Sequence, residues 1–192
     1  MFFYQKLADL KNPFYSRWLL NIIYYISTAM KRAIFIGQAM PKIKKDPHDW
    51  SSLNAWLYTI GITDQIIKDN FFYSALVDYF PGLKGHSHRI PTPQEITKER
   101  DRLEYTMKSF SPEIVVPIGR LSIAHCLSQD VQPLIGIIGK AFLADPYKLL
   151  DRELPIVPLP HPSGASTWHY KKENKMLLTK ALQLLKRNLL LI

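Results

Sequence analysis

The sequence contains one cysteine, Cys126, among its 192 residues. A single thiol cannot build an internal disulfide framework, a Cys-rich zinc site or the ligand set of an iron–sulfur cluster. We therefore expect a chain with no iron–sulfur cluster. The scarcity of cysteine also favours an intracellular protein, and we expect a cytoplasmic one.

The sequence also lacks a long hydrophobic run. The best candidate, residues 18–30, covers about 13 residues and is interrupted by Asn21, whereas a helix that spans a bilayer needs about 20 apolar residues. We expect residues 1–29 to form a helical N-terminal extension packed on the domain, and we expect no membrane partner. An interfacial segment is the alternative. A natural start at Met30 is a third possibility, because MKRAIFIG opens like the first strand of a domain.

Acidic residues are outnumbered: 25 Lys and Arg face 16 Asp and Glu, for a net charge of +9. A hydrophobic fraction of 47% with 21% charged residues is typical of a globular domain with its own core. The positive excess is concentrated after residue 167 and predicts a polyanionic partner such as nucleic acid, with a solvated helix face as the alternative. The basic residues there are Lys171, Lys172, Lys175, Lys180, Lys186 and Arg187.

From residue 31 onward, strand-like and helix-like segments alternate. Short apolar runs predict strands at residues 33–36, 71–79, 113–118 and 156–159, and residues 134–143 predict a Gly-interrupted strand or pair of strands. Helical patterns lie at residues 51–60, 63–70, 92–110, 121–127 and 172–189. This alternation is typical of an α/β sandwich with a mostly parallel sheet.

Some helix ends are marked by capping signals. Ser51 and Ser52 are candidate caps, and Gly61 is suited to close that helix. Thr92 followed by Pro93, with Glu95 three residues after the cap, is a strong helix start.

Two loops rich in Gly, Pro and small residues follow the first and last predicted strands. The first is GQAMP, formed by Gly37, Gln38, Ala39, Met40 and Pro41. The second is HPSGAS, from His161 to Ser166, about 120 residues later. In parallel sheets the ligand site lies beyond the carboxyl ends of the strands, so we expect both loops at one edge.

These motifs, in this order, resemble those of the uracil-DNA glycosylase superfamily. GQAMP is similar to its first motif and LPHPSGAS to its second. Pro81-Gly82, Arg89, Pro91, Glu95-Ile96 and SPEIVVPIG between them resemble the family 4 branch and its cluster-free relatives. The resemblance covers about residues 31–190. It implies a three-layer α/β sandwich with a central, mostly parallel four-stranded sheet, formed by residues 30–192. It also implies base excision repair of DNA, with no metal and no organic cofactor.

The resemblance also implies roles for the second loop. His161 would donate a hydrogen bond to the carbonyl oxygen of the departing base, which carries negative charge. Pro162, Ser163, Gly164, Ala165 and Ser166 would contact DNA. Ala165 replaces the Leu with which relatives fill the vacated stack, so Trp168 is the substitute candidate, with ordinary packing as the alternative. Lys171 and Lys172 would add phosphate contacts.

In the first loop, the resemblance assigns Gly37, Ala39, Met40 and Pro41 to the base pocket. Gln38 stands where relatives place a carboxylate or Asn that positions the attacking water. A Gln can orient water but cannot act as a general base. The nearest carboxylates, Asp46 and Asp49, could swing in, but we favour the interpretation that they are loop and helix-start acids.

Two further base contacts are expected. His48 or Trp50 matches the segment where relatives stack an aromatic on the base, and Trp50 is also a candidate core residue. The position of the uracil-reading Asn is occupied by Ala75, which leaves backbone groups or Ser74 to read the base.

Three functions are therefore weighed. The first is a monomeric DNA glycosylase that uses His161 and Gln38. The second is a paralogue that binds DNA or a nucleobase and turns over weakly, since GQAMP has no carboxylate. The third is a membrane-surface or interaction protein that uses residues 18–30 and the basic C-terminal helix.

Overall fold

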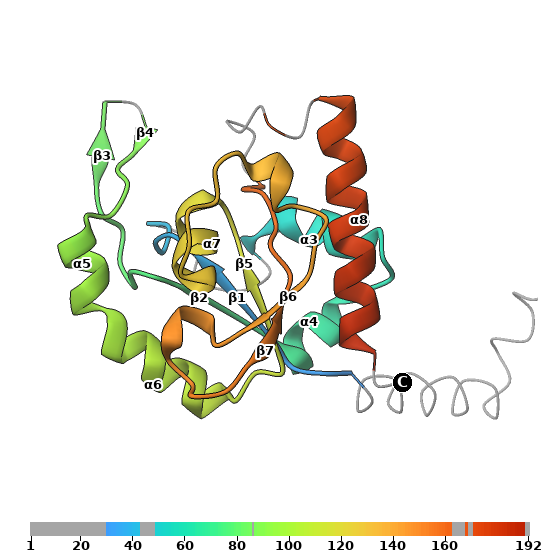
Figure 1. Cartoon of the computed structure of the whole chain (residues 1–192), viewed down its shortest axis with the longest axis horizontal. Coiled ribbons are helices and arrows are strands. Elements are labelled where there is room, and N and C mark those ends of the chain that lie inside the picture. The colour runs from blue at the N-terminus through green and yellow to red at the C-terminus, as the bar shows by residue number, and fades with distance from the viewer. Residues whose placement is uncertain (1–29, 43–48, 86, 163–167, 169–170, 191–192) are drawn as a thin grey trace, which may run out of the picture.

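The computed structural model describes residues 30–42, 49–85, 87–162, 168 and 171–190, arranged around a central sheet (Figure 1). The sheet has five strands in the order β2-β1-β5-β7-β6. The strands β2, β1, β5 and β7 are parallel, and β6 pairs antiparallel with β7. The predicted parallel strands are thus present, and the antiparallel edge strand is a fifth. Their bounds are β1 Ala33–Gly37, β2 Phe71–Ala75, β5 Ile114–Pro117, β6 Phe142–Ala144 and β7 Leu154–Ile156.

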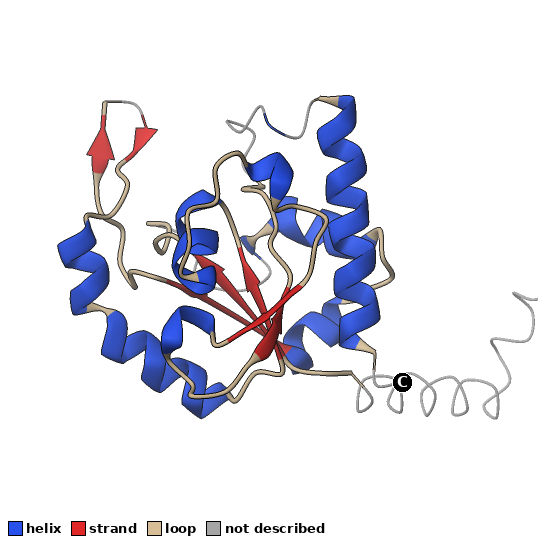
Figure 2. Ribbon diagram, in the orientation of Figure 1, coloured by secondary structure: helices blue, strands red, loops and turns tan. Residues whose placement is uncertain are grey.

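Helices cover both faces of this sheet, which gives the predicted three-layer α/β sandwich (Figure 2). Side chains alternate along β1 because successive residues of a strand point to opposite faces. Phe35 packs in the core shared with α3, α4 and α8, while Ile34 and Ile36 pack in the core shared with α5 and α6. The helices are α3 Ser51–Tyr58, α4 Asp64–Asn70, α5 Pro93–Lys98, α6 Arg100–Phe110, α7 Arg120–Leu127 and α8 Lys172–Leu189.

Two of the predicted helix ends are confirmed. The Thr92 hydroxyl accepts a hydrogen bond from the Glu95 amide (3.2 Å), and the Glu95 carboxylate accepts one from the Thr92 amide (2.8 Å). This reciprocal pair is a capping box. Gly61, three residues after the last residue of α3, has a φ of +85°, and its amide donates to the Tyr58 carbonyl (3.0 Å). The left-handed backbone explains why a glycine closes this helix.

Other expectations about element ends were wrong. Neither Ser51 nor Ser52 caps α3, because the helix already begins at Ser51 and the preceding Trp50 makes no side-chain cap bond. The helix expected over residues 92–110 divides at Glu99 into α5 and α6. The strand expected over residues 71–79 ends at Ala75, opposite Gly37, where its partner β1 also ends.

The Gly-interrupted segment at residues 134–143 also differs from expectation. It begins with the 3-10 helix η3 (Leu134–Gly136), and only Phe142–Ala144 form a strand, β6. Between them Gly139 has a φ of +83°, and a Cβ there would lie 3.3 Å from Leu177 of α8. The close packing of Gly139 against α8 and its left-handed backbone explain why this part of the segment does not form a strand. The strand expected at residues 156–159 is β7, two residues earlier, followed by a single bridge between Leu159 and Ile118.

Outside the central sheet, β3 (Leu83–Lys84) and β4 (Ser87–His88) form a separate antiparallel pair that projects from the body (Figure 1). The predicted N-terminal extension, residues 1–29, lies outside the described residues. Within the described part, no helix is both long and apolar enough to cross a membrane.

Candidate active site

The ends of β1, β5 and β7 are held side by side by backbone hydrogen bonds. The Ile118 amide donates to the Ile36 carbonyl (2.8 Å), and the Leu159 amide donates to the Pro117 carbonyl (3.0 Å). The loops that follow β1 and β7 therefore leave the sheet at one edge, with the end of β5 between them. This is the convergence that the two loop motifs predicted.

His161 lies at this edge against the backbone of Gly119. The Gly119 amide donates to the Leu159 carbonyl (2.9 Å), which brings the end of β5 beside the second loop. A Cβ on Gly119 would lie 3.5 Å from Cδ2 of His161, and Gly119 has a φ of +80°. The position therefore favours glycine through its backbone conformation, and the imidazole packs directly on it.

The imidazole of His161 is kept largely neutral at pH 7. The protein atoms around it lower its pKa below the ordinary 6.5, and the nearby His88 lowers it further, although part of the side chain is solvent-exposed. Surrounding protein disfavours the charged form, and so does a second positive charge. A neutral imidazole still carries one N–H, so it can donate a hydrogen bond to a carbonyl oxygen.

The first loop is fastened to the segment that follows β2. The Gly37 carbonyl accepts from the Leu76 amide (2.9 Å), and the Met40 amide donates to the Val77 carbonyl (3.0 Å). Between these anchors Gln38 is half-buried, and its side chain makes no hydrogen bond to any described residue. Its amide group is thus not committed to a contact within the described part of the fold.

The next three residues of this loop, Ala39, Met40 and Pro41, are also partly buried. Ala39 packs against the core on the α6 side of the sheet. Met40 and Pro41 are half-buried. Their assignment to the base pocket stays a prediction.

Trp50 and Ser74 lie beneath Gly37. A Cβ at Gly37 would be 3.7 Å from the Ser74 carbonyl oxygen and 3.8 Å from Cη2 of Trp50. Trp50 is tilted against Tyr73 with ring centroids 5.9 Å apart, and it packs on the core. Its buried Nε1 has no hydrogen-bond partner among the described residues. The Trp50 side chain therefore packs on the core and also reaches Gly37 in the first loop through the Cη2 end of its ring.

Arg102 supports the same region from α6. Its guanidinium donates to the Ala75 carbonyl (2.7 Å) and to the Glu99 carboxylate (2.7 Å). Glu99 also accepts from the Asp78 amide (3.2 Å). The segment that holds the first loop is thus itself tied to α6, which makes Arg102 a positioning residue.

Several predicted site residues lie outside the described part of the chain, and their roles stay predictions. They are Asp46 and His48 after the first loop, and Ser163, Gly164, Ala165 and Ser166 in the second. Pro162 is described and buried. In the described part, no group of three or more His, Cys, Asp or Glu side chains is arranged to hold a metal ion.

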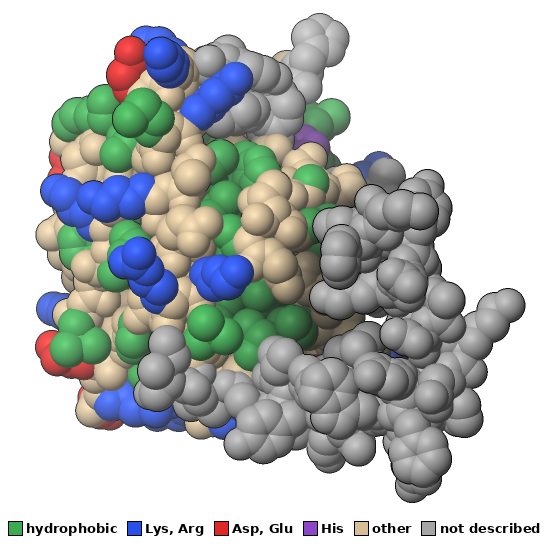
Figure 3. All heavy atoms as spheres, turned by 90° about the vertical axis from the view of Figure 1, so that its right-hand side faces the viewer, with side chains coloured by type: hydrophobic (Ala, Val, Ile, Leu, Met, Phe, Trp, Pro, Cys, Tyr) green, Lys and Arg blue, Asp and Glu red, His purple; other side chains and the backbone are tan. Residues whose placement is uncertain are grey.

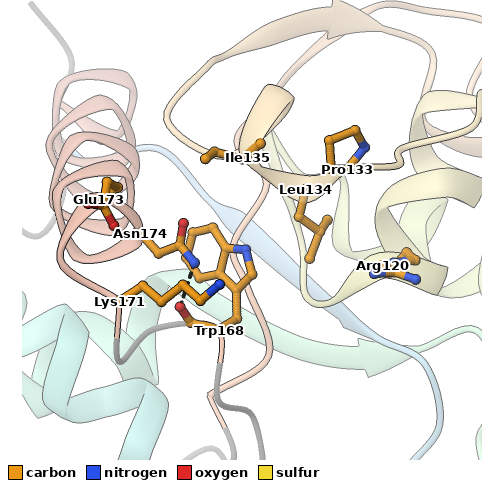
Figure 4. A pocket seen from close by; sticks show the side chains of 8 residues that line it. All are labelled: Arg120, Pro133, Leu134, Ile135, Trp168, Lys171, Glu173 and Asn174. Carbon is orange, nitrogen blue, oxygen red and sulfur yellow. Dashed lines mark hydrogen bonds between the residues drawn. The ribbon is translucent and has the colours of Figure 1, made fainter.

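Trp168 and Lys171 line a cavity of about 440 Å³ between the start of α7, η3 and the start of α8 (Figure 4). Lys172 is exposed in the first turn of α8. Figure 3 faces the side where α8 lies, and Lys and Arg side chains are spread over it rather than gathered in one patch. The exposed basic residues of α8 are Lys172, Lys175, Lys180, Lys186 and Arg187.

Sequence reasoning missed three residues near this edge: Gly119, Arg120 and His88. The signal for the first two was present, because Gly119-Arg120 follows a buried strand just as Gly37-Gln38 does. His88 gave no such signal, since only the fold brings β4 close enough to affect His161.

The family model for the uracil DNA glycosylase superfamily matches residues 25–186 of the chain. No curated protein matches the sequence.

Proposed function

Since this chain belongs to the uracil DNA glycosylase superfamily, we propose that it hydrolyses the N-glycosidic bond of uracil, or of a related deaminated base, flipped out of DNA. The observation that carries the proposal is the shared sheet edge. The loop with Gln38 and the imidazole of His161 border the end of β5 from opposite sides. A base bound at this edge would have Gln38 on one side and the imidazole of His161 on the other.

His161 would stabilise the leaving base. When the bond between C1′ of the sugar and the base nitrogen breaks, the electron pair leaves with the base, and negative charge develops on a ring carbonyl oxygen. The neutral imidazole carries one N–H group and can donate it in a hydrogen bond to that oxygen. Its lowered pKa favours this neutral form at pH 7. Such a donor acts by electrostatic stabilisation of the departing anion.

Gln38 would orient the attacking water. The water oxygen forms the new bond to C1′ and gives up its proton to solvent. Because an amide cannot accept that proton as a base, Gln38 contributes position alone. Asp46 is the alternative if a carboxylate takes part.

Gly37, Trp50 and Ser74 would form the wall of the base pocket. A side-chain carbon at Gly37 would already be in contact with the Ser74 carbonyl and the Trp50 indole, so these three residues lie close enough together to form one wall. Its neighbours Ala39, Met40 and Pro41 complete the loop. Backbone groups here, or the Ser74 hydroxyl, would read the base in place of the missing Asn. The second loop, Lys171 and Lys172 would hold the DNA backbone.

The direct test is uracil release from single-stranded and double-stranded oligonucleotides. We expect His161→Ala to lower the rate by roughly 10²–10³-fold, as removal of an oxyanion donor does. His125→Ala is the matched control, because His125 also has a lowered pKa but lies on α7 against Tyr147. Equal rates for His161→Ala and the wild type would remove the proposed role of His161.

A second candidate is a protein that binds damaged DNA with little turnover. The absence of a carboxylate from Gly37 to Pro41 favours it. Tight binding of abasic or uracil-containing DNA with no product after long incubation would support this candidate. Clear turnover would exclude it.

A further inference from the structure

The cavity beside α8 has an apolar wall and a cationic wall. Leu134 and Ile135 of η3 supply apolar side chains, while Arg120 and Lys171 supply two positive charges (Figure 4). Both cations are exposed, and neither forms an ion pair with another described residue. The lining residues include one acid, Glu173. The balance of charge favours an anionic group in the cavity.

Two helix starts reinforce this charge. Arg120 is the first residue of α7, and Lys171 immediately precedes the first residue of α8. Neither helix has a side chain that caps its first turn. Unsatisfied amide groups at a helix start add a partial positive charge to that of the two side chains.

An indole, that of Trp168, lines the same cavity as the two cations. Trp168 is half-buried, and its backbone carbonyl accepts a short hydrogen bond from the Asn174 side chain (2.6 Å). This bond ties Trp168 to the first turn of α8. An aromatic ring in a positively charged groove is an arrangement by which proteins bind single-stranded nucleic acid.

The cavity adjoins the proposed active site along the chain and in space. Arg120 directly follows Gly119, on which His161 packs. Trp168 follows His161 by seven residues. A DNA strand with one nucleotide at His161 would therefore carry its neighbour toward this cavity.

We propose, as an extension of the proposed function, that this cavity binds the nucleotide next to the excised one. Its base stacks on Trp168, and the cations that line the cavity, Arg120 and Lys171, bind the phosphates beside that base. A volume of about 440 Å³ is in the range of sites for one small ligand. Because a base can stack on Trp168 only after it leaves its own stack, the substrate is single-stranded at this position.

The test measures whether the effect of removing one base depends on the presence of Trp168. A set of single-stranded oligonucleotides, each with one base removed at a different position, is bound to the wild type and to Trp168→Ala, and affinity is measured by fluorescence anisotropy. At one position beside the target base, base removal weakens wild-type binding by roughly tenfold, as loss of a stacked base does. The same removal has no effect on Trp168→Ala.

Two variants separate stacking from folding. Trp168 packs partly on the core, so Trp168→Phe is included, and it should restore most of the coupling. Arg120→Gln and Lys171→Gln should each reduce the slope of log affinity against log salt by about one. Arg187→Gln, at the other end of α8, is the matched control, and its slope should change less than either.

The outcomes distinguish the two proposals, because this readout needs no turnover. Coupling at one position without uracil release would support the nucleotide site and overturn the glycosylase proposal. Uracil release without coupling at any position would overturn the nucleotide site and leave the glycosylase proposal standing. Wild-type binding by both Trp168→Ala and Trp168→Phe would also overturn the nucleotide site.

Discussion

The imidazole of His161 rests on the backbone of Gly119, at the turn between β5 and α7. The contact joins residues 42 positions apart in the sequence. It depends on a glycine with a φ of +80°, a conformation that other residues adopt only at a cost. The orientation of the proposed catalytic group is thus tied to the shape of a neighbouring turn.

Gly119→Ala is expected to impair both stability and activity. The backbone strain should lower the free energy of unfolding by about 1–3 kcal/mol. Any relaxation of that strain displaces the surface on which His161 packs, so the rate of uracil release should also fall. Gly61→Ala is the matched control, because Gly61 has a similar φ of +85° at the end of α3 and has no contact with His161. It should lose stability with an unchanged rate. An unchanged rate in Gly119→Ala as well would show that the turn does not position the imidazole.

The activity is expected to decline on the acid side of neutrality. The pKa of His161 lies below 6.5, so the neutral form persists at pH 7 and is lost only as the pH falls through the lowered value. The unfolded chain, with its ordinary pKa, takes up the proton first, so the His161 contribution to stability also falls as the pH drops below 6.5. Rate profiles must therefore be measured beside thermal unfolding at each pH. A rate that rises on acidification would mean that the charged imidazole is the active form.

His88→Gln should shift this profile. His88 lowers the pKa of His161 through its positive charge, and removal of the charge should move the acid limb of the rate profile to higher pH. A profile identical to that of the wild type would show that β4 exerts no such effect in solution.

Gln38 variants test the role of the first loop. Gln38→Ala should lower the rate of uracil release, because the water loses an orienting hydrogen bond. Gln38→Glu places a carboxylate at nearly the same distance, and a positioned base contributes roughly 10²–10⁴-fold in other enzymes. We expect the Glu variant to exceed the wild type in rate. If the Ala variant retains the full rate, the water is held by another group, with Asp46 the first candidate to mutate.

Arg102→Ala should weaken substrate binding more than the loss of an exposed ion pair does. Arg102 joins Glu99 to the Ala75 carbonyl beneath the first loop. Its loss leaves that carbonyl without this donor, at a cost of roughly 1–2 kcal/mol, and loosens the segment that anchors Gly37. Lys108→Ala on the same helix is the control, because it breaks only the exposed pair with Glu104, worth about 0.5 kcal/mol or less. Chemical denaturation and KM measurements on both variants compare the two. Equal effects in both would remove the positioning role.

The sequence predicted those elements whose signals are local. Lys172–Leu189 was expected as a helix and forms α8 with those bounds, because apolar residues at helical spacing extend over its whole length. Thr92 and Glu95 form the expected capping box, since both partners lie within one helical turn. The buried strand after residue 32 was expected because a short apolar run ended by glycine suits only a core position.

The sequence could not predict where short apolar segments pair. Residues 134–143 were expected to be a Gly-interrupted strand or pair of strands but become η3 and β6, because packing of Gly139 against α8 and pairing with β7 decide their backbone. The same holds for His88 and Arg120, whose importance depends on neighbours distant in sequence.

By itself the sequence determined the helices with strong caps or long apolar faces, the alternation that makes an α/β sandwich, and the two loop motifs with His161 and Gln38. Only the tertiary structure decided that Gly119 supports His161, that Trp50 and Ser74 lie beneath Gly37, and that Arg120 and Trp168 share a cavity. Local signals act through bonds within a few residues. These contacts instead follow from the order of strands in the sheet, which is settled by packing over the whole domain.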